Sequence, residues 1–204
     1  RENKGEHDAA IADLDQAIAI NSRNDNAYVL RGRVRQAKGI LDGAIQDFAE
    51  ALKINPRLAE AYSCRGTALV DSGKLDAAIQ DFAEALKIDP RSAEALTGLG
   101  DAHLQKGDLD AAIQEFTEAL KIDPRIAKAI AGLGAAHTQK GDLDAAIADY
   151  TKAIALDPIN AEMYFLRGTL NYLKGDPDGA IADLNQAIAL DPGMALAFYI
   201  RGTA

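Results

Sequence analysis

A period of 34 residues runs through this chain. Gly66, Gly100, Gly134 and Gly168 each lie 34 residues after the one before. A fixed period of this length indicates stacked supersecondary units rather than a single closed globule, because each unit buries its apolar face against its neighbours. Such arrays usually work through their surfaces, so the period favours a binding role over catalysis.

Each period predicts two helices, as residues 59–92 illustrate. One face of the first helix carries Tyr62, Gly66 and Leu69. We expect Gly73 to end this helix as its C-terminal cap, and Asp76 to begin the second, where a carboxylate suits the positive end of the helix dipole. The second helix is amphipathic through Ala78, Ile79, Phe82, Ala85, Leu86 and Ile88. It should stop before Pro90, since proline disfavours helical geometry in the preceding residue.

The same phase divides the chain into full and partial repeats. The full repeats are residues 25–58, 59–92, 93–126, 127–160 and 161–194. Residues 1–24 match only the latter part of a repeat, with Arg1 late in a first helix, and residues 195–204 match only the beginning of one. Short connections predict antiparallel neighbouring helices. Because such arrays normally need a polar capping element at each end, we expect a fragment or disordered flanking segments.

Several recurring residues resemble the tetratricopeptide repeat family over essentially the whole chain. A large apolar or aromatic residue recurs in the first helix at Tyr28, Tyr62, Leu96, Ile130, Tyr164 and Phe198, followed by Gly32, Gly66, Gly100, Gly134, Gly168 and Gly202. The second helix carries alanines at Ala10, Ala44, Ala78, Ala112, Ala146 and Ala180, and again at Ala17, Ala51, Ala85, Ala119, Ala153 and Ala187. Its aromatic position holds Phe48, Phe82, Phe116 and Tyr150, and the repeats close at Pro56, Pro90, Pro124, Pro158 and Pro192. The departures are Ser22 for the closing proline, Leu14 and Leu184 for the aromatic, and Pro177 at a helix start, where proline is tolerated.

The resemblance implies a fold and a function. The fold would be an all-α, right-handed superhelical solenoid of tandem helix-turn-helix repeats, forming a single array over residues 1–204. The function would be that of a protein–protein interaction scaffold, which holds a partner peptide or helix in its concave groove. Two alternatives remain open: self-assembly into oligomers through exposed repeat edges, and a regulatory or docking domain of a larger enzyme.

In the family, the groove is lined by the face of the first helix that points away from the packed face. The residues predicted to line it here are Val29, Arg33, Ser63, Thr67, Thr97, Asp101, Leu104, Ala131, Ala135, Phe165, Thr169, Tyr172 and Tyr199. Phe165, Tyr172 and Tyr199 would serve as apolar anchors. The small residues Thr97, Ala131 and Ala135 would form the floor.

Arg33 would orient an acidic group of the bound peptide. It is the single counterpart of the Lys, Arg and Asn pattern in the subclass that clamps C-terminal carboxylates, so that specialised function is not expected. The alternative for the aromatic residues is structural, with Phe165 and Tyr172 packed against a following repeat and Tyr199 at a frayed edge. The basic cluster of Arg31, Arg33, Arg35 and Lys38 is typical of a solvated face with salt bridges.

A column of arginines precedes the repeat glycines on the inward face. It consists of Arg31, Arg65, Arg167 and Arg201, with Leu99 and Leu133 in the central repeats. An unpaired charge there would be costly, so we expect partners among the aspartates of the second helices, which are Asp13, Asp47, Asp81, Asp149 and Asp183. These pairs should fix the register between helices.

Composition and motifs disfavour other classes of function. The net charge of −9 disfavours nucleic acid as a partner, and no apolar run approaches the roughly 18 residues of a membrane helix. Cys64 is the single cysteine, which favours a reducing, cytoplasmic location. His103 and His137 lie one period apart but lack further ligands for a metal, so we interpret them as structural. No nucleotide loop or catalytic motif is present, and we expect no enzymatic activity, cofactor or metal.

Overall fold

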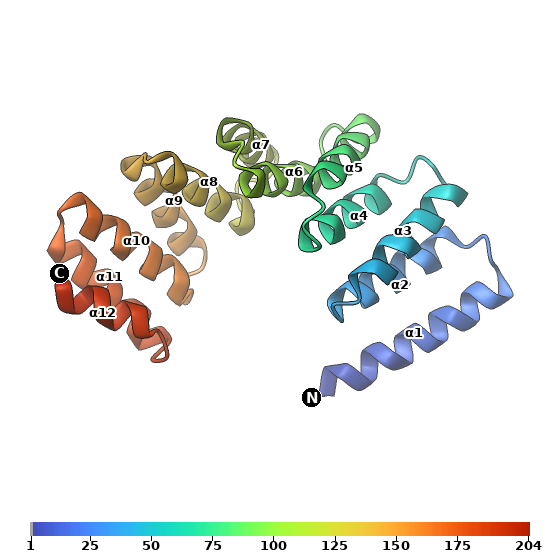
Figure 1. The fold of residues 1–204 in the computed structure, drawn as a ribbon, viewed down its shortest axis with the longest axis horizontal. Coiled ribbons are helices and arrows are strands. Elements are labelled where there is room, and N and C mark those ends of the chain that lie inside the picture. The colour runs from blue at the N-terminus through green and yellow to red at the C-terminus, as the bar shows by residue number, and fades with distance from the viewer. Residues whose placement is uncertain (1) are drawn as a thin grey trace. The chain divides into compact units, whose positions relative to one another are not determined.

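The computed structural model describes residues 2–204, and their side chains from Gly5 onward. This part of the chain contains twelve α-helices and no strand (Figure 1). The first helices of the repeats, called A helices here, are α2 (Asp25–Ala37), α4 (Ala59–Asp71), α6 (Ala93–Lys106), α8 (Ala127–Lys140), α10 (Ala161–Lys174) and α12 (Ala195–Thr203). The second helices, called B helices, are α1 (Glu2–Ile20), α3 (Leu41–Ile54), α5 (Leu75–Ile88), α7 (Leu109–Ile122), α9 (Leu143–Leu156) and α11 (Pro177–Leu190). The predicted all-α fold of helical hairpins is confirmed.

The chain divides into two compact units. Unit 1 extends to Lys106 and holds α1 to α6, whereas unit 2 begins at Gly107 and holds α7 to α12. The division falls inside the predicted repeat 93–126, between its two helices. Within each unit, every A helix is packed against a neighbouring B helix, as α4 and α5 are in unit 1 and α10 and α11 are in unit 2 (Figure 1).

The turn between the helices of a hairpin depends on glycine. Gly73, predicted to cap α4, has a φ of 74°, and Gly141 caps α8 with a φ of 81°. This left-handed conformation is strained for a side chain with a Cβ atom, which explains why glycine recurs there. The amide of Gly141 donates to the carbonyl oxygens of His137 and Thr138, so it also satisfies the end of the helix.

The N-terminal partial repeat differs from the sequence prediction. The end of one helix and the start of another were expected in residues 1–24, but α1 continues without a turn from Glu2 to Ile20. Gly39 turns with a φ of 75°, whereas Gly5, one repeat earlier, has no positive φ. A continuous helix pairs its own backbone groups even where no neighbouring helix is packed against it. Arg1, which was placed late in a first helix, lies outside the described residues.

Aromatic side chains of the B helices fill the core between the hairpins. Phe82 in α5 is fully buried, and its ring lies between Gly66 of α4 and Gly98 of α6. A Cβ atom built on Gly98 would come within 2.3 Å of the Cζ atom of Phe82. Unit 2 repeats the arrangement, where a Cβ atom on Gly132 would lie 2.4 Å from Phe116. The glycines therefore allow the backbone of the A helix to approach an aromatic ring closely.

Buried ion pairs join the two helices of several hairpins, as predicted. Arg65 donates through Nε and Nη2 to both carboxylate oxygens of Asp81, at 2.6 and 2.7 Å. Arg31 and Asp47 form the same pair in repeat 25–58, and Arg167 and Asp183 form it in repeat 161–194. Such pairs disfavour any slip between helices, because a slip would leave a buried carboxylate without its partner.

The other arginines and aspartates that were predicted to pair have different partners. Leu133 replaces the arginine in repeat 127–160, and the Asp149 carboxylate there lies 2.8 Å from His137 Nδ1. His137 is therefore a structural residue between helices, as interpreted from the sequence. Arg201 donates to Asn185, 2.6 Å away. The prediction of an arginine partner for Asp13 is not realised among the described residues. Asp13 is exposed, and Arg31, which pairs with Asp47, donates in addition to Asp15.

Candidate functional site

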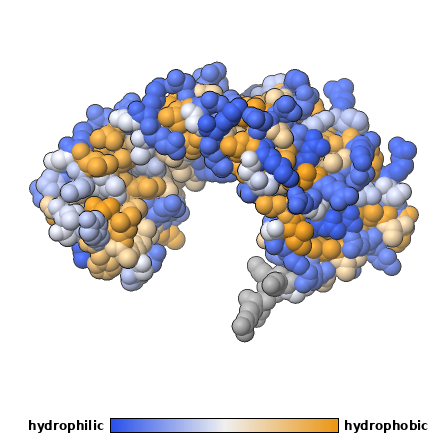
Figure 2. Space-filling view, in the orientation of Figure 1, coloured by the Kyte–Doolittle hydropathy of each residue, from blue (hydrophilic) through white to orange (hydrophobic). Residues whose placement is uncertain are grey.

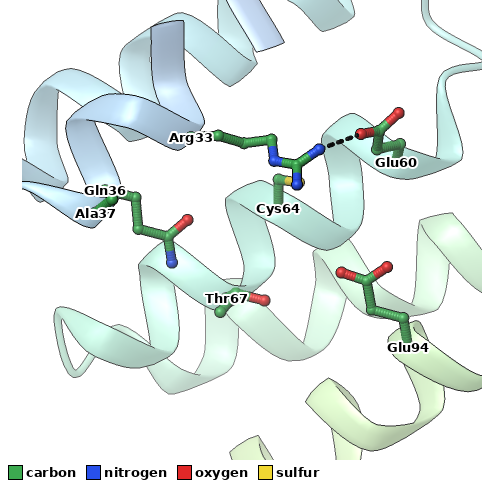
Figure 3. Close-up of a pocket in the computed structure, with 7 residues that line it drawn as sticks. All are labelled: Arg33, Gln36, Ala37, Glu60, Cys64, Thr67 and Glu94. Atoms are coloured by element: carbon green, nitrogen blue, oxygen red, sulfur yellow. Dashed lines mark hydrogen bonds and ion pairs between the residues drawn. The ribbon is translucent and has the colours of Figure 1, made fainter. Parts of the chain in front are cut away.

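Three successive A helices of unit 1 enclose a surface pocket of about 380 Å³. It is lined by Arg33, Gln36 and Ala37 of α2, by Glu60, Cys64 and Thr67 of α4, and by Glu94 of α6 (Figure 3). The volume falls within the range of known ligand pockets. The pocket lies on the face of the A helices that the sequence assigned to the groove, and Arg33 and Thr67 belong to both.

Helical spacing explains why these side chains converge. Glu60, Cys64 and Thr67 are four and then three residues apart on α4, so they form one stripe along its surface. Glu94 lies 34 residues after Glu60, and therefore occupies the same place in the first turn of the next A helix. Figure 3 shows Arg33 reaching across from α2, with its guanidinium above Cys64.

The charges of the pocket are only partly compensated. Arg33 Nη1 lies 3.2 Å from Glu60 Oε1, and both side chains are more than half exposed. An ion pair this exposed contributes little stability and opens easily. Gln36 donates to Asp71, 2.8 Å away, at one end of the pocket. Within the described part of the chain, no hydrogen bond or ion pair engages the carboxylate of Glu94.

The thiol of Cys64 lies among these charges. Burial and, to a smaller extent, the negative charges of Glu94 and Glu60 together raise its pKa to about 11, against a lowering effect of Arg33. A thiol with so high a pKa stays protonated near neutral pH, and the protonated thiol is a poor nucleophile. Cys64 is therefore a neutral wall of the pocket rather than a reactive group.

Other residues predicted for the groove in unit 1 are less accessible than expected. Val29, Ser63 and Thr97 are 4, 4 and 5% exposed, so they offer almost no surface to a ligand. Val29 packs in an apolar cluster that includes alanines of α4, because adjacent A helices lie close together. Asp101 and Leu104 of α6 are half-buried.

Unit 2 presents a more apolar surface on its A helices. Of the predicted groove residues, four are half-buried, namely Ala131, Ala135, Phe165 and Thr169. Tyr172 is 38% exposed and Tyr199 is 69% exposed. Their exposed apolar neighbours are Leu173, Leu196 and Phe198. Figure 2 shows hydrophobic surface on the part of unit 2 that holds α10 and α12.

The sequence prediction left out five of the residues that line the pocket of unit 1. These are Gln36, Ala37, Glu60, Cys64 and Glu94. The repeat register could have indicated two of them, since Glu60 and Glu94 occupy the same position in the first turns of consecutive A helices. Ala37 and Cys64 carry no comparable signal, because a small side chain becomes a pocket wall only through the spacing of the helices around it.

A second pocket, of about 330 Å³, lies between α9, α10 and α11 in unit 2. Its charged groups are already bound to one another. Arg167 donates to Asp183 and to Thr151, and Asn171 also donates to Asp183. This pocket therefore has no free polar group for a ligand, and its network is structural.

The structure gives no support for a metal site or a membrane span in the described residues. No group of three or more His, Cys, Asp or Glu side chains among them could hold a metal ion. None of their helices combines the length and the apolar character that crossing a membrane requires.

Comparisons with known proteins agree on one architecture. A family model described as tetratricopeptide repeat matches residues 2–59, 65–125 and 132–195. No curated protein sequence matches the chain. Among solved structures, PilW, described as a widely conserved type IV pilus biogenesis factor, matches 98% of this chain and 92% of its own, with a TM-score of 0.89 and 20% identity.

Two further solved structures are similar along most of their length. YrrB, described as a tetratricopeptide repeat protein with an unusual peptide-binding site, has a TM-score of 0.71 and 21% identity, covering 93% of this chain and 97% of its own. MamA has a TM-score of 0.72 and 29% identity, covering 81% of this chain and 96% of its own. At these identities the likeness to PilW and YrrB concerns the fold alone.

Proposed function

The chain belongs to the tetratricopeptide repeat family, whose fold generally mediates protein–protein interaction, and we propose that it binds an extended peptide or a helix of a partner protein on the A-helix face of unit 1. Proteins of this family are typically scaffolds rather than enzymes. The neutral thiol of Cys64 agrees with a binding role, because it provides no nucleophile in the pocket.

The observation that carries the proposal is the pocket formed by α2, α4 and α6. Its lining residues come from three successive repeats, so a segment that crosses the A helices would contact all of them at once. The pocket is open to solvent and combines charged groups with the small walls of Ala37 and Cys64. A site of this kind suits one anchoring side chain of a longer segment, with the rest of the segment on the surface around it.

The exposed aromatic side chains of unit 2 form a second candidate contact. Tyr172 and Tyr199 are the most exposed of the predicted anchors. Aromatic residues dominate the energetics of many interfaces, and truncating one often costs about 2 kcal/mol or more. The peptide-binding site of YrrB, as its description states it, supports a peptide as the class of ligand for this fold.

The proposal is tested by selecting peptides and then blocking the pocket. A library of random dodecapeptides is displayed and selected against the immobilised chain, and the affinities of the selected peptides are measured by fluorescence anisotropy. Thr67→Arg places a long side chain in the pocket from the middle of its stripe. We expect this variant to weaken binding at least tenfold, which corresponds to about 1.4 kcal/mol.

Thr117→Arg is the matched control, since Thr117 is exposed on the B helix α7 of unit 2. It adds the same side chain and charge outside the pocket, and it should leave affinity unchanged. Circular dichroism establishes that both variants remain folded. Equal weakening by the two substitutions, or no weakening by Thr67→Arg, would show that the pocket is not the binding site.

A second candidate function is self-association through α12. Leu196, Phe198 and Tyr199 are 57, 44 and 69% exposed on this one helix, and clustered apolar side chains favour contact with another molecule. Sedimentation equilibrium over a range of concentrations tests this candidate. A Leu196→Glu, Tyr199→Glu variant should abolish any oligomer, whereas a wild-type chain that stays monomeric throughout would exclude self-association.

A further inference from the structure

We propose that the pocket of unit 1 receives a lysine or arginine side chain of the partner, whose cationic group lies between the carboxylates of Glu60 and Glu94. This inference rests on the proposed function, since it names the chemistry of the partner for the same site. It reverses the expectation from the sequence, in which Arg33 would orient an acidic group.

The arrangement of charge in the pocket favours a cationic ligand. Arg33 is the one cationic side chain among the described residues of the lining, and it already pairs with Glu60. Glu94 faces the same space from α6 and forms no hydrogen bond or ion pair with the other described residues, so the lining carries one carboxylate in excess (Figure 3). A bound cation would restore the balance, whereas a bound carboxylate would add to the repulsion.

The thiol of Cys64 reports the electrostatic potential inside the pocket. Apart from burial, the influences on its thiol are the two carboxylates, which raise its pKa, and Arg33, which lowers it. The carboxylates are the larger of these influences. The pocket is therefore an environment that favours positive charge.

The shape of the pocket suits a long side chain with a charged end. Lysine and arginine carry a charged group at the end of a long apolar stem, and that stem packs readily against apolar surface. Ala37, Cys64 and Thr67 provide small walls of the pocket beside the two carboxylates (Figure 3). A side chain that lies across the pocket from α2 toward α6 would thus have small walls along its stem and the two carboxylates near its tip (Figure 3).

An alternative explanation for the glutamates is that they only stabilise their helices. Both occupy a first turn, where negative charge is favoured by the helix dipole. The repeats show that the fold does not require this charge, because the equivalent positions hold Asn26 and Lys128. Glu162 in α10 has the same helical position but does not line the pocket, so it serves as the control that separates the two explanations.

The test uses a small probe of the proposed side chain. n-Butylguanidinium is titrated into the full ¹⁵N-labelled chain, and amide chemical shifts are followed by NMR, with butyrate as the anionic counterpart. We expect butylguanidinium to shift the amides of residues 60, 64 and 94, and butyrate to leave them in place. The Glu60→Gln, Glu94→Gln variant should weaken this binding by about fivefold or more, because it removes both carboxylates. Glu162→Gln should leave the binding unchanged.

The variant Arg33→Gln tests the direction in which the affinity for butylguanidinium changes. It frees Glu60 from its intramolecular partner, so it should tighten the binding of butylguanidinium. A weaker response in this variant, shifts by butyrate instead, or equal loss in the Glu162→Gln control would overturn the inference. A chain whose pocket amides do not respond to butylguanidinium at all would overturn it as well.

The outcome is distinguishable from a failure of the proposed function. Selected peptides that depend on Thr67 but contain no basic residue would leave the binding function standing and refute the cationic ligand. Butylguanidinium binding without any peptide that depends on the pocket would uphold the charge preference and refute the peptide-binding function.

Discussion

The close approach of Gly98 to the ring of Phe82 leads to a quantitative prediction about repeat stacking. A Cβ atom at Gly98 would lie 2.3 Å from Phe82 Cζ, and ordinary contact requires roughly 1 Å more. The ring is fully buried, so it has no free space into which to move. Gly98→Ala should therefore introduce a packing cost of about 1–3 kcal/mol, partly offset by the roughly 1 kcal/mol that alanine gains over glycine within a helix.

The packing cost is separated from the helix gain by changing Phe82 to leucine. Leucine already occupies this position in unit 2, where Leu184 faces Gly168. In the Phe82→Leu background, Gly98→Ala should become neutral or stabilising, because the ring that it strikes is gone. The free energies of unfolding of the four proteins are measured by urea denaturation followed by circular dichroism. We expect a coupling energy of about 1–3 kcal/mol, and equal effects of Gly98→Ala in both backgrounds, within about 0.5 kcal/mol, would refute the reasoning.

Three further predictions concern other features of the structure. Arg65→Leu leaves the buried carboxylate of Asp81 without its partner and should lower the free energy of unfolding by about 3–5 kcal/mol, as urea denaturation would show; a loss below 1 kcal/mol would contradict the structural role of the pair. The rate of alkylation of Cys64 by iodoacetamide should rise with pH until the pH passes about 11. At a fixed lower pH, Glu94→Gln should increase this rate, because removing a negative charge lowers the pKa of the thiol. An unchanged rate in the variant would contradict the electrostatic account of the pocket. Asp176→Ala removes the carboxylate that accepts a hydrogen bond from the Gly179 amide in the first turn of α11. The free energy of unfolding should fall by about 1 kcal/mol, and the melting temperature should fall with it. An unchanged melting temperature would show that this cap is dispensable.

The sequence predicted the hairpins well because their determinants are local and repeated. Gly73 and Pro90 define helix ends through their own backbone preferences, and the apolar spacing of α5 defines its buried face. The pairing of Arg65 with Asp81 was also predictable, since both residues recur in register on inward faces. The exception was α1, where the repeat register placed the end of a first helix but the structure has one continuous helix from Glu2 to Ile20.

The candidate site was predicted less completely because it depends on distances between helices. Ser63 and Thr97 share a register with the exposed Tyr199, yet neighbouring A helices in unit 1 lie close enough to bury them. The ion pair of Arg33 with Glu60 was not predicted, because Glu60 lies 27 residues away and on another helix. The excess negative charge at Glu94 emerges only once the three helices are placed side by side.

Protection of Cys64 by a bound peptide tests the central claim most directly. Cys64 is the single cysteine of the chain, so its alkylation reports on the pocket alone. A peptide selected for binding is titrated into the chain, and the alkylation rate of Cys64 is compared with occupancy measured by anisotropy. If the pocket of unit 1 is the binding site, the rate should fall in proportion to occupancy, because the bound segment covers the thiol. A peptide that saturates the chain while Cys64 reacts at its original rate would contradict the account.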